Sequence, residues 1–231
     1  MVEPNQIPII TIDGPGGTGK GTLALRLTRW LGWHFLDSGA LYRTLGFLVL
    51  KQQISLNDGE KILEVASNMN IHFDDDGLEN MVFLNGCNVT NLIRTEECGA
   101  FASELAAVRL VRGTLLKRQR DFLTVPGLVA DGRDMGTTVF PDANLKIYLT
   151  ASIEERAQRR HKQLKQKGIT ARLARLSEDI RLRDDRDRQR QESPMKPASD
   201  AEIVDTTGLS IAEVEQSIRR LVKSRFGKSF D

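Results

Sequence analysis

Apolar and polar positions alternate along the chain between short apolar runs and longer stretches with helical spacing. The first apolar run, 8–12, is followed by Leu23, Leu27 and Leu31 at four-residue intervals. This spacing places apolar side chains along one face of a helix and predicts a helix over about 20–31. Later apolar runs at 128–130, 145–149 and 202–204 predict further strands. A last helical pattern lies at about 211–222. Short strands separated by helices predict an α/β fold, a parallel sheet with helices on both faces.

Two segments depart from this alternation. In the first, about 59–98, apolar runs at 71–73 and 81–84 flank the polar run 74–77. Apolar runs separated by turn residues are typical of antiparallel strands, so we expect a small inserted subdomain. The second, about 154–191, is dense in Arg, Lys and Gln with few apolar positions. We expect exposed and mobile helices there.

Length and composition indicate a soluble globular chain. Its 231 residues, 40% hydrophobic and 28% charged, can bury one ordinary core. No apolar run reaches the roughly 18 residues of a membrane helix, and the N-terminus lacks the features of a secretory signal, so we expect a cytoplasmic protein without membrane contact. A net charge of +2 is too small to recruit nucleic acid non-specifically. Because no long heptad or exposed apolar helix face is evident, we expect a monomer.

A glycine-dense loop joins the first predicted strand to the first predicted helix. Gly14, Gly19 and Lys20 satisfy the pattern G-x-x-x-x-G-K in this context, which predicts a phosphate-binding loop. Glycines let successive backbone N–H groups face a polyphosphate, the helix N-terminus adds partial positive charge, and Lys20 reaches the terminal phosphates. Gly21 stands where a Ser or Thr would normally hold a metal ion, and Thr22 comes one position late. The alternative is a glycine-rich turn without a ligand, which the strand-loop-helix context disfavours.

Candidate residues for binding a phosphate acceptor lie in two other places. One is the end of the predicted strand 128–130, and the other is the start of the helical pattern after Leu36. Asp131 ends a strand, at the edge where open α/β sheets bind ligands, so we expect it to orient a metal ion through water. Arg133 and Arg43 are candidate phosphate clamps, because a planar guanidinium binds phosphate bidentately. The alternatives are a simple strand-end turn around Asp131 and, for Asp37 or Ser38, a helix N-cap.

The densest charge run lies in the second unusual segment. On a helix, Arg183, Asp187 and Arg190 fall at i, i+4 and i+7 and share a face. Such a run is often a solvated, salt-bridged surface. Arginines that neutralise a transferring phosphoryl group can be worth ~10³–10⁵ in rate, so this segment is also a candidate supplier of catalytic arginines.

The phosphate-loop pattern alone does not separate GTPases, motor ATPases and kinases. An Asn-Lys-x-Asp base-reading motif, expected of a GTPase, is absent from the sequence. A kinase of small-molecule alcohols would need a carboxylate base, for which Asp37 is the obvious choice. A nucleotide-gated or RNA-binding module could use the Arg-rich segment, but the near-neutral net charge and the lack of aromatic residues among those arginines weigh against it.

Four motifs together resemble the bacterial cytidylate kinases, within the nucleoside monophosphate kinase family. They are GPGGTGKGT, LDSGALYR, ADGRDMGTTVFPDA and RDDRDRQR, and the resemblance covers nearly the whole chain. It implies an adenylate-kinase-like phosphate-loop core, an acceptor domain enlarged by the insert, and a short lid. It also implies phosphorylation of CMP and dCMP, with ATP as the donor and Mg²⁺ as the metal. The expected division is a core of 1–36, 109–155 and 192–231, a monophosphate-binding domain of 37–108, and a lid with its following helix at 156–191.

The resemblance also implies roles for individual residues. The acceptor phosphate would be surrounded by Ser38, Arg43, Arg133 and Arg190, the cytosine read by Ser103, Arg112 and Asp134, and the sugar contacted by Arg183 and Asp187. The ATP phosphates would be held by Gly14, Pro15, Gly16, Gly17, Thr18, Gly19, Lys20, Gly21 and Thr22. Among the lid arginines Arg156, Arg159 and Arg160, we assign Arg160 to ATP. The catalytic set is Lys20, Arg133, Arg183 and Arg190.

A physical argument agrees with a phosphate acceptor. The second pKa of a phosphate monoester is about 6, so the attacking oxygen is already ionised at neutral pH and needs no general base. Catalysis then depends on positioning and charge neutralisation, which arginines and a metal provide. The chain has many arginines near its motifs and only 3 histidines.

Overall fold

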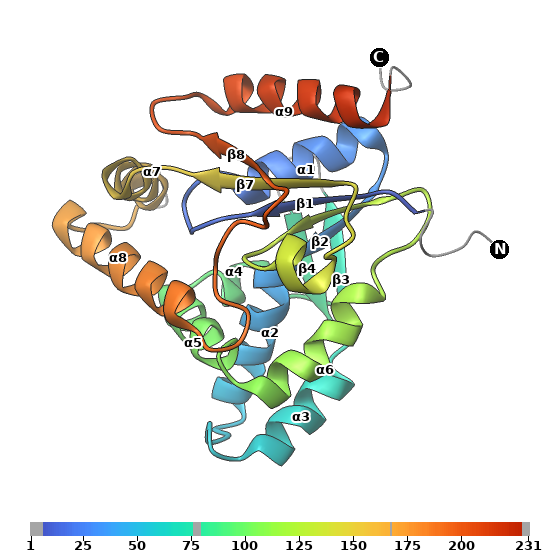
Figure 1. Cartoon of the computed structure of the whole chain (residues 1–231). Coiled ribbons are helices and arrows are strands. Elements are labelled where there is room, and N and C mark those ends of the chain that lie inside the picture. The colour runs from blue at the N-terminus through green and yellow to red at the C-terminus, as the bar shows by residue number, and fades with distance from the viewer. Residues whose placement is uncertain (1–6, 76–79, 167, 228–231) are drawn as a thin grey trace.

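Five parallel strands form the main sheet, in the order β2-β6-β1-β7-β8 (Figure 1). The structure, a computed structural model, describes residues 7–75, 80–166 and 168–227. The strands are β1 (Ile9–Asp13), β2 (His34–Asp37), β6 (Leu128–Asp131), β7 (Leu145–Thr150) and β8 (Glu202–Asp205). The α/β prediction is confirmed, but β2 was not expected. It lies at the sheet edge with only Leu36 buried, so it leaves no apolar run in the sequence.

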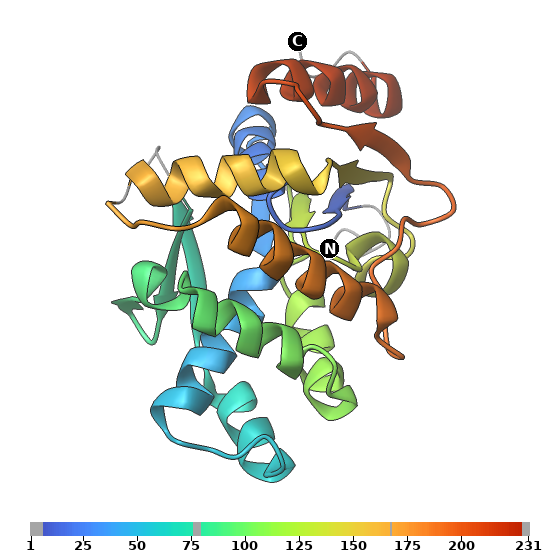
Figure 2. The ribbon, with the colours of Figure 1, turned by 90° about the vertical axis from the view of Figure 1, so that its left-hand side faces the viewer.

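Helices cover both faces of this sheet because successive strand side chains point to opposite sides. Ile10 and Ile12 pack with Leu27 and Ile218 against α1 and α9 on one face. Ile9 belongs to the core on the other face, which α2 and α6 cover (Figures 1 and 2). Burying each such side chain contributes about 1.5–3 kcal/mol. These helices are α1 (Lys20–Leu31), α2 (Ser38–Lys51), α6 (Arg109–Arg120) and α9 (Ile211–Phe226).

The segment in which we expected an inserted subdomain contains the expected antiparallel sheet. Strand β4 (Asn80–Leu84) pairs with β3 (Ile71–Asp75) and with the two-residue strand β5 (Cys87–Asn88), which was not predicted. Asn85 and Gly86 form the turn between β4 and β5, with positive φ angles of 50° and 80°. The turn predicted at 74–77 lies partly outside the described residues. The other helices of this region are α3 (Gly59–Asn68), α4 (Thr90–Ile93) and α5 (Glu96–Leu105).

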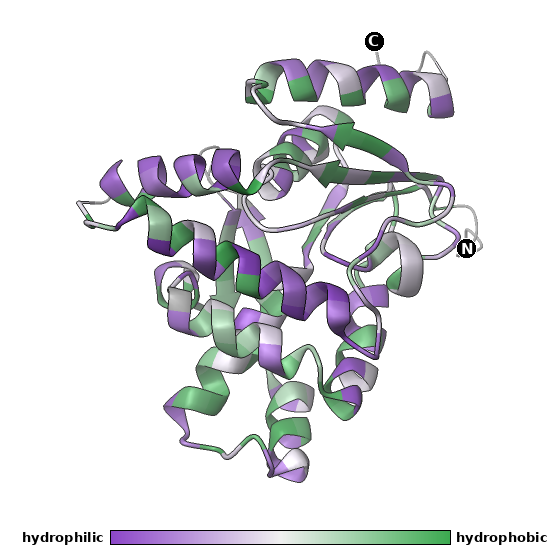
Figure 3. Cartoon of the chain, turned by 60° about the vertical axis from the view of Figure 1, so that its left-hand side comes forward, coloured by the Kyte–Doolittle hydropathy of each residue, from purple (hydrophilic) through white to green (hydrophobic). Residues whose placement is uncertain are grey.

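The Arg-rich segment forms two helices, α7 (Ile153–Gln166) and α8 (Leu173–Gln189), which pack against each other. Figure 3 shows that both helices are largely hydrophilic beside the hydrophobic strands. Most positions of this segment are exposed or half-buried, as expected, but Arg156 is 1% exposed and Asp184 and Asp187 are each 2% exposed. These charges bond to one another and to the core, which composition does not reveal. Across the described ranges, no helix is both long and apolar enough to cross a bilayer.

Candidate active site

The loop between β1 and α1 follows a path that requires glycine. Gly14 has φ 135°, and a Cβ there would lie 2.0 Å from the carbonyl oxygen of Leu149. Gly17 has φ 83°, and its added Cβ would lie 3.1 Å from Cβ of Arg156. Gly19 caps α1 in a left-handed conformation and offers no side-chain cap. The first N–H groups of α1 therefore have no capping side chain and can serve an anion, as at other helix N-termini.

The amine of Lys20 lies inside this loop. Its Nζ donates to the carbonyl oxygen of Pro15 at 2.8 Å, and Thr18 Oγ1 donates to the same oxygen at 3.1 Å. Burial, and next the charge of Arg133, lower the pKa of Lys20 from 10.5 to about 7, against the opposing charge of Asp131. Negative phosphates beside the amine would favour its charged form.

Asp131 ends β6 opposite the N-terminus of α1. A Cβ added to Gly21 would lie 3.3 Å from Asp131 Oδ2, so the glycine keeps open the space beside this carboxylate. Burial raises the pKa of Asp131 to about 7, with Lys20 opposing the shift. Thr22 is exposed, and Asp37, the neighbour of Asp131 in register on β2, caps α2. Within the part of the chain that the structure describes, no three His, Cys, Asp or Glu side chains cluster as metal ligands.

Asp13 ends β1 beside Asp131, and the sequence analysis did not single it out. Its carboxylate accepts the N–H groups of Met135 and Gly136, each at 2.8 Å. These bonds hold the turn after β6 that carries Arg133 and Asp134. Burial raises the pKa of Asp13 to about 6, against the two backbone hydrogen bonds. Its place at the end of a predicted strand, the signal used for Asp131, could have identified it.

One buried carboxylate gathers predicted acceptor residues from three segments. Asp187 accepts from Ser103 Oγ on α5 at 2.8 Å, from Arg133 Nε after β6 at 3.3 Å, and from Arg190 Nη2. Burial by itself would raise the pKa of Asp187, but the charges of Arg133, Arg190 and Arg183 outweigh it and hold the pKa below its usual value. Asp187 therefore stays ionised at neutral pH and preassembles cationic groups. We call Asp187, Ser103, Arg133 and Arg190 the Asp187 cluster.

Arg190 lies at the C-terminal end of α8. α8 ends at Gln189, and Arg190 is the C-cap residue with φ −56° and ψ 135°. Arg190 therefore lies one residue beyond the helix, and it pairs with Asp187 three positions earlier, as the predicted shared face implied. The Nε of Arg190 is buried and has no hydrogen-bond acceptor among the described residues. A buried donor without a partner is costly, so this N–H is suited to an incoming acceptor.

Arg112 and Asp134, predicted together as base readers, form a buried ion pair. Burial raises the pKa of Asp134, and the charge of Arg112 opposes the shift. The Arg112 guanidinium carbon lies 6.0 Å from the ring centroid of Tyr42. The Tyr42 hydroxyl is buried without a hydrogen-bond partner among the described residues, and burial raises its pKa to about 12. Tyr42 thus belongs to the site, although the sequence did not single it out.

Ser38 and Arg43 are held outside the Asp187 cluster. Ser38 Oγ donates to Gln119 Oε1 on α6 at 2.8 Å. Gln119 is 2% exposed, and no feature of the sequence pointed to it. Arg43 Nη1 donates to the carbonyl oxygens of Ile93 and Thr95 at 3.0 and 2.9 Å. These bonds link α2 to α6 and to the loop after α4.

The three lid arginines occupy different surroundings. Arg156 is buried against the phosphate-binding loop, and its Nη1 donates to the carbonyl oxygen of Gly16 at 3.1 Å. Arg159 donates to the carbonyl oxygen of Thr206 at 2.6 Å and to its hydroxyl at 3.1 Å. Arg160 is half-buried, and it donates to Gln163 on its own helix at 3.4 Å. The assignment of Arg160 to ATP stays a prediction.

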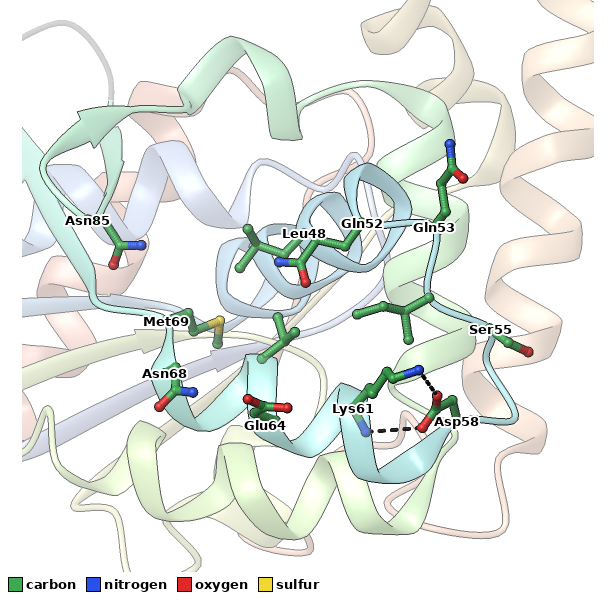
Figure 4. Close-up of a pocket in the computed structure, with 12 residues that line it drawn as sticks. Leu48, Gln52, Gln53, Ser55, Asp58, Lys61, Glu64, Asn68, Met69 and Asn85 are labelled. Atoms are coloured by element: carbon green, nitrogen blue, oxygen red, sulfur yellow. Dashed lines mark hydrogen bonds and ion pairs between the residues drawn. The ribbon is translucent and has the colours of Figure 1, made fainter.

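A cavity of about 650 Å³ lies away from these residues, between the end of α2 and α3 (Figure 4). Leu48 and Met69 form part of its wall, and Asp58 and Lys61 pair across 3.0 Å at one side. None of the predicted site residues lines it. This cavity is therefore separate from the candidate site described above.

Comparisons with known proteins identify the family of this chain. The family model for cytidylate kinase matches residues 10–224. A cytidylate kinase from Nitrosococcus oceani is 54% identical over 216 residues, which cover 92% of this chain and 95% of that protein. One from Aeromonas salmonicida is 49% identical, covering 97% of each chain. A solved thymidylate kinase from Candida albicans aligns with 94% of this chain and 92% of its own, but at 12% identity and a TM-score of 0.44 it is too distant to argue from. The chain belongs to the cytidylate kinase family.

Proposed function

We propose that this chain transfers a phosphoryl group from ATP to CMP and dCMP, giving CDP and dCDP. The observation that supports it best is the Asp187 cluster, which gathers two arginines beside the phosphate-binding loop. A Cβ added to Gly16 of that loop would lie 3.5 Å from Arg133 Nη2. The cationic groups thus lie where a second phosphate could meet the first.

On the donor side, the loop 14–22 is suited to a nucleoside triphosphate. The first N–H groups of α1 lack a side-chain cap. Lys20 is buried in the loop, where it can exchange the Pro15 carbonyl for a phosphate oxygen. Placing Lys20 against the transferring group would neutralise charge as it develops.

The acceptor side combines two buried groups of charges. Arg133 and Arg190 are suited to the acceptor phosphate, and Arg183 to the sugar, because a guanidinium offers several fixed donors to phosphate or hydroxyl oxygens. Arg112 and Asp134, with Ser103, offer donors and an acceptor for a cytosine edge. Ser38 and Arg43 would approach the same phosphate from α2. A phosphate acceptor is ionised at neutral pH, so these residues bind, orient and neutralise charge rather than remove a proton.

The residues present fit Mg²⁺ bound mainly by phosphates and waters. Mg²⁺ usually keeps several waters and takes one or two carboxylates rather than a dedicated protein cage. Asp131, beside the gap kept open by Gly21, is the carboxylate positioned to accept hydrogen bonds from such waters. When bound, Mg²⁺ would neutralise charge on the donor phosphates. We also propose that the protein acts as a cytoplasmic monomer, for which light scattering after gel filtration tests the oligomeric state.

A coupled ADP-release assay tests the proposed function. ATP and Mg²⁺ are supplied with CMP, dCMP, UMP, AMP, GMP or simple sugars in turn. We expect CMP and dCMP to react much faster than the other acceptors. Equal rates with AMP and CMP would contradict the assignment of the base-reading residues, and turnover only with an alcohol would contradict the reaction class.

A further inference from the structure

Arg156 is buried although it belongs to the predicted lid. It projects from the first turn of α7 and is 1% exposed. Its guanidinium makes three contacts in different directions: Nε donates to the carbonyl oxygen of Ala151 at 3.2 Å, Nη1 to that of Gly16 at 3.1 Å, and Nη2 to Asp184 Oδ2 at 2.6 Å. One side chain therefore joins the phosphate-binding loop to α8.

The phosphate-binding loop and α7 lie too close together for a larger residue between them. An added Cβ at Gly17 would lie 3.1 Å from Cβ and 3.6 Å from Cα of Arg156. The loop therefore contacts Arg156 at two consecutive residues, through packing at Gly17 and through the hydrogen bond at Gly16. A displacement of the loop would be transmitted to the arginine.

Asp184 places the other end of this connection next to acceptor residues. It is 2% exposed and lies between Arg183 and Asp187 on α8. Asp184 and Asp187 are three positions apart, so they lie on the same side of the helix, and both are buried. Fixing Asp184 therefore fixes the rotation and depth of the helix end that carries Asp187 and Arg190 of the Asp187 cluster.

Few apolar contacts hold the two lid helices. Their buried apolar side chains form a small separate cluster of Ala157, Leu164 and Leu176. This cluster packs α7 against α8 but does not include residues of the phosphate-binding loop. Polar contacts, and the Arg156–Asp184 pair in particular, therefore set where α8 lies relative to that loop.

We propose that Arg156 and Asp184 are a pair of positioning residues that hold the acceptor arginines at the correct distance from the donor phosphates. The inference rests on the proposed function, because it concerns the alignment of two nucleotides. Each nucleotide keeps its own binding residues when the pair is removed. The pair therefore contributes to turnover more than to the affinity for either substrate alone, since small misplacements of reacting groups are costly.

Two variants separate positioning from stability. Replacing a buried ion pair by apolar residues is often neutral or stabilising, so Arg156→Met with Asp184→Leu should fold. Arg156→Lys keeps a cation for Asp184 but cannot also donate to Ala151 and Gly16. We expect both variants to retain the wild-type unfolding midpoint within a few degrees. We expect kcat to fall roughly 10–100-fold in both, with dissociation constants for ATP alone and CMP alone changed less than about threefold.

The matched control is an ion pair on the exposed side of α8. Arg181 and Glu178 pair at 2.7 Å in solvent, so Glu178→Gln should leave kcat unchanged. Wild-type kcat in either Arg156 variant would overturn the inference, as would an activity loss that merely follows the fraction unfolded. If the wild-type protein itself does not phosphorylate CMP, the proposed function fails instead, and the two failures are thereby distinguished.

Discussion

Gly21→Ala is expected to stabilise the protein and impair its activity. Gly21 is the second residue of α1, where alanine is a better helix former by about 0.5–1 kcal/mol. Its φ is not positive, so alanine needs no strained backbone. For a domain of this size, such a gain taken alone raises Tm by about 1–4 °C, and the contact of the added Cβ with Asp131 offsets part of it.

The loss of activity is expected to arise at Asp131. The new methyl carbon would lie 3.3 Å from Asp131 Oδ2, a tight contact that excludes water from that side of the carboxylate. If Asp131 orients metal-bound water there, kcat should fall by about 10–100-fold, the range expected for small misplacements in a site. The measurement is ADP release at saturating CMP and ATP over a Mg²⁺ titration, together with thermal unfolding.

Gly113→Ala is the matched control. Gly113 lies within α6, and a Cβ there would have no neighbour within 4 Å. The same gain in Tm is expected with no change in activity. Wild-type activity of Gly21→Ala at every Mg²⁺ concentration would refute the placement of the metal beside Asp131.

Three further predictions follow from particular contacts. Because burial lowers the pKa of Lys20 to about 7 and phosphates favour its charged form, binding of ATP without Mg²⁺ should take up about half a proton at pH 7 and more at pH 8. Calorimetry in two buffers of different ionisation enthalpy measures this, and proton release at pH 8 would contradict it. Arg190→Met should lower turnover by about 10³-fold or more. The far-UV circular dichroism should be unchanged, because Asp187 still accepts hydrogen bonds from Ser103 and Arg133. Loss of folding would instead indicate that the Arg190–Asp187 ion pair is structural. Gly127→Ala would place a Cβ 2.5 Å from the indole of Trp33, so it should lower the free energy of unfolding by about 1–3 kcal/mol and lower Tm, with kcat retained. An unchanged Tm would show that the ring moves freely.

The sequence predicted the strand, glycine loop and helix of the candidate donor site because these elements are contiguous in the chain. Strand, glycine loop and helix follow one another, and the positive φ angles at Gly14, Gly17 and Gly19 are properties of single residues. Strands such as 128–130 were found because both sheet faces are buried and leave apolar runs. Strand β2 was missed because an edge strand with one buried residue leaves no such run.

The acceptor site was recognised from motifs, but its arrangement depends on contacts between distant segments. Asp187 meets Ser103 across 84 positions and Arg133 across 54, and Ser38 meets Gln119 across 81. Helical spacing placed Arg190 on α8, yet the helix ends one residue earlier.

The chain by itself thus determined the alternation of strands and helices, the phosphate-binding loop and the residue types available for an acceptor. Local backbone preferences and the periodicity of burial depend on near neighbours, so they can be inferred from order along the chain. Only the tertiary structure decided which charges are buried and which partners they have, as the pairing of Arg156 with Asp184 illustrates. In sequence, a buried ion pair has the same composition as a solvated one, and the difference arises when separate segments pack around it.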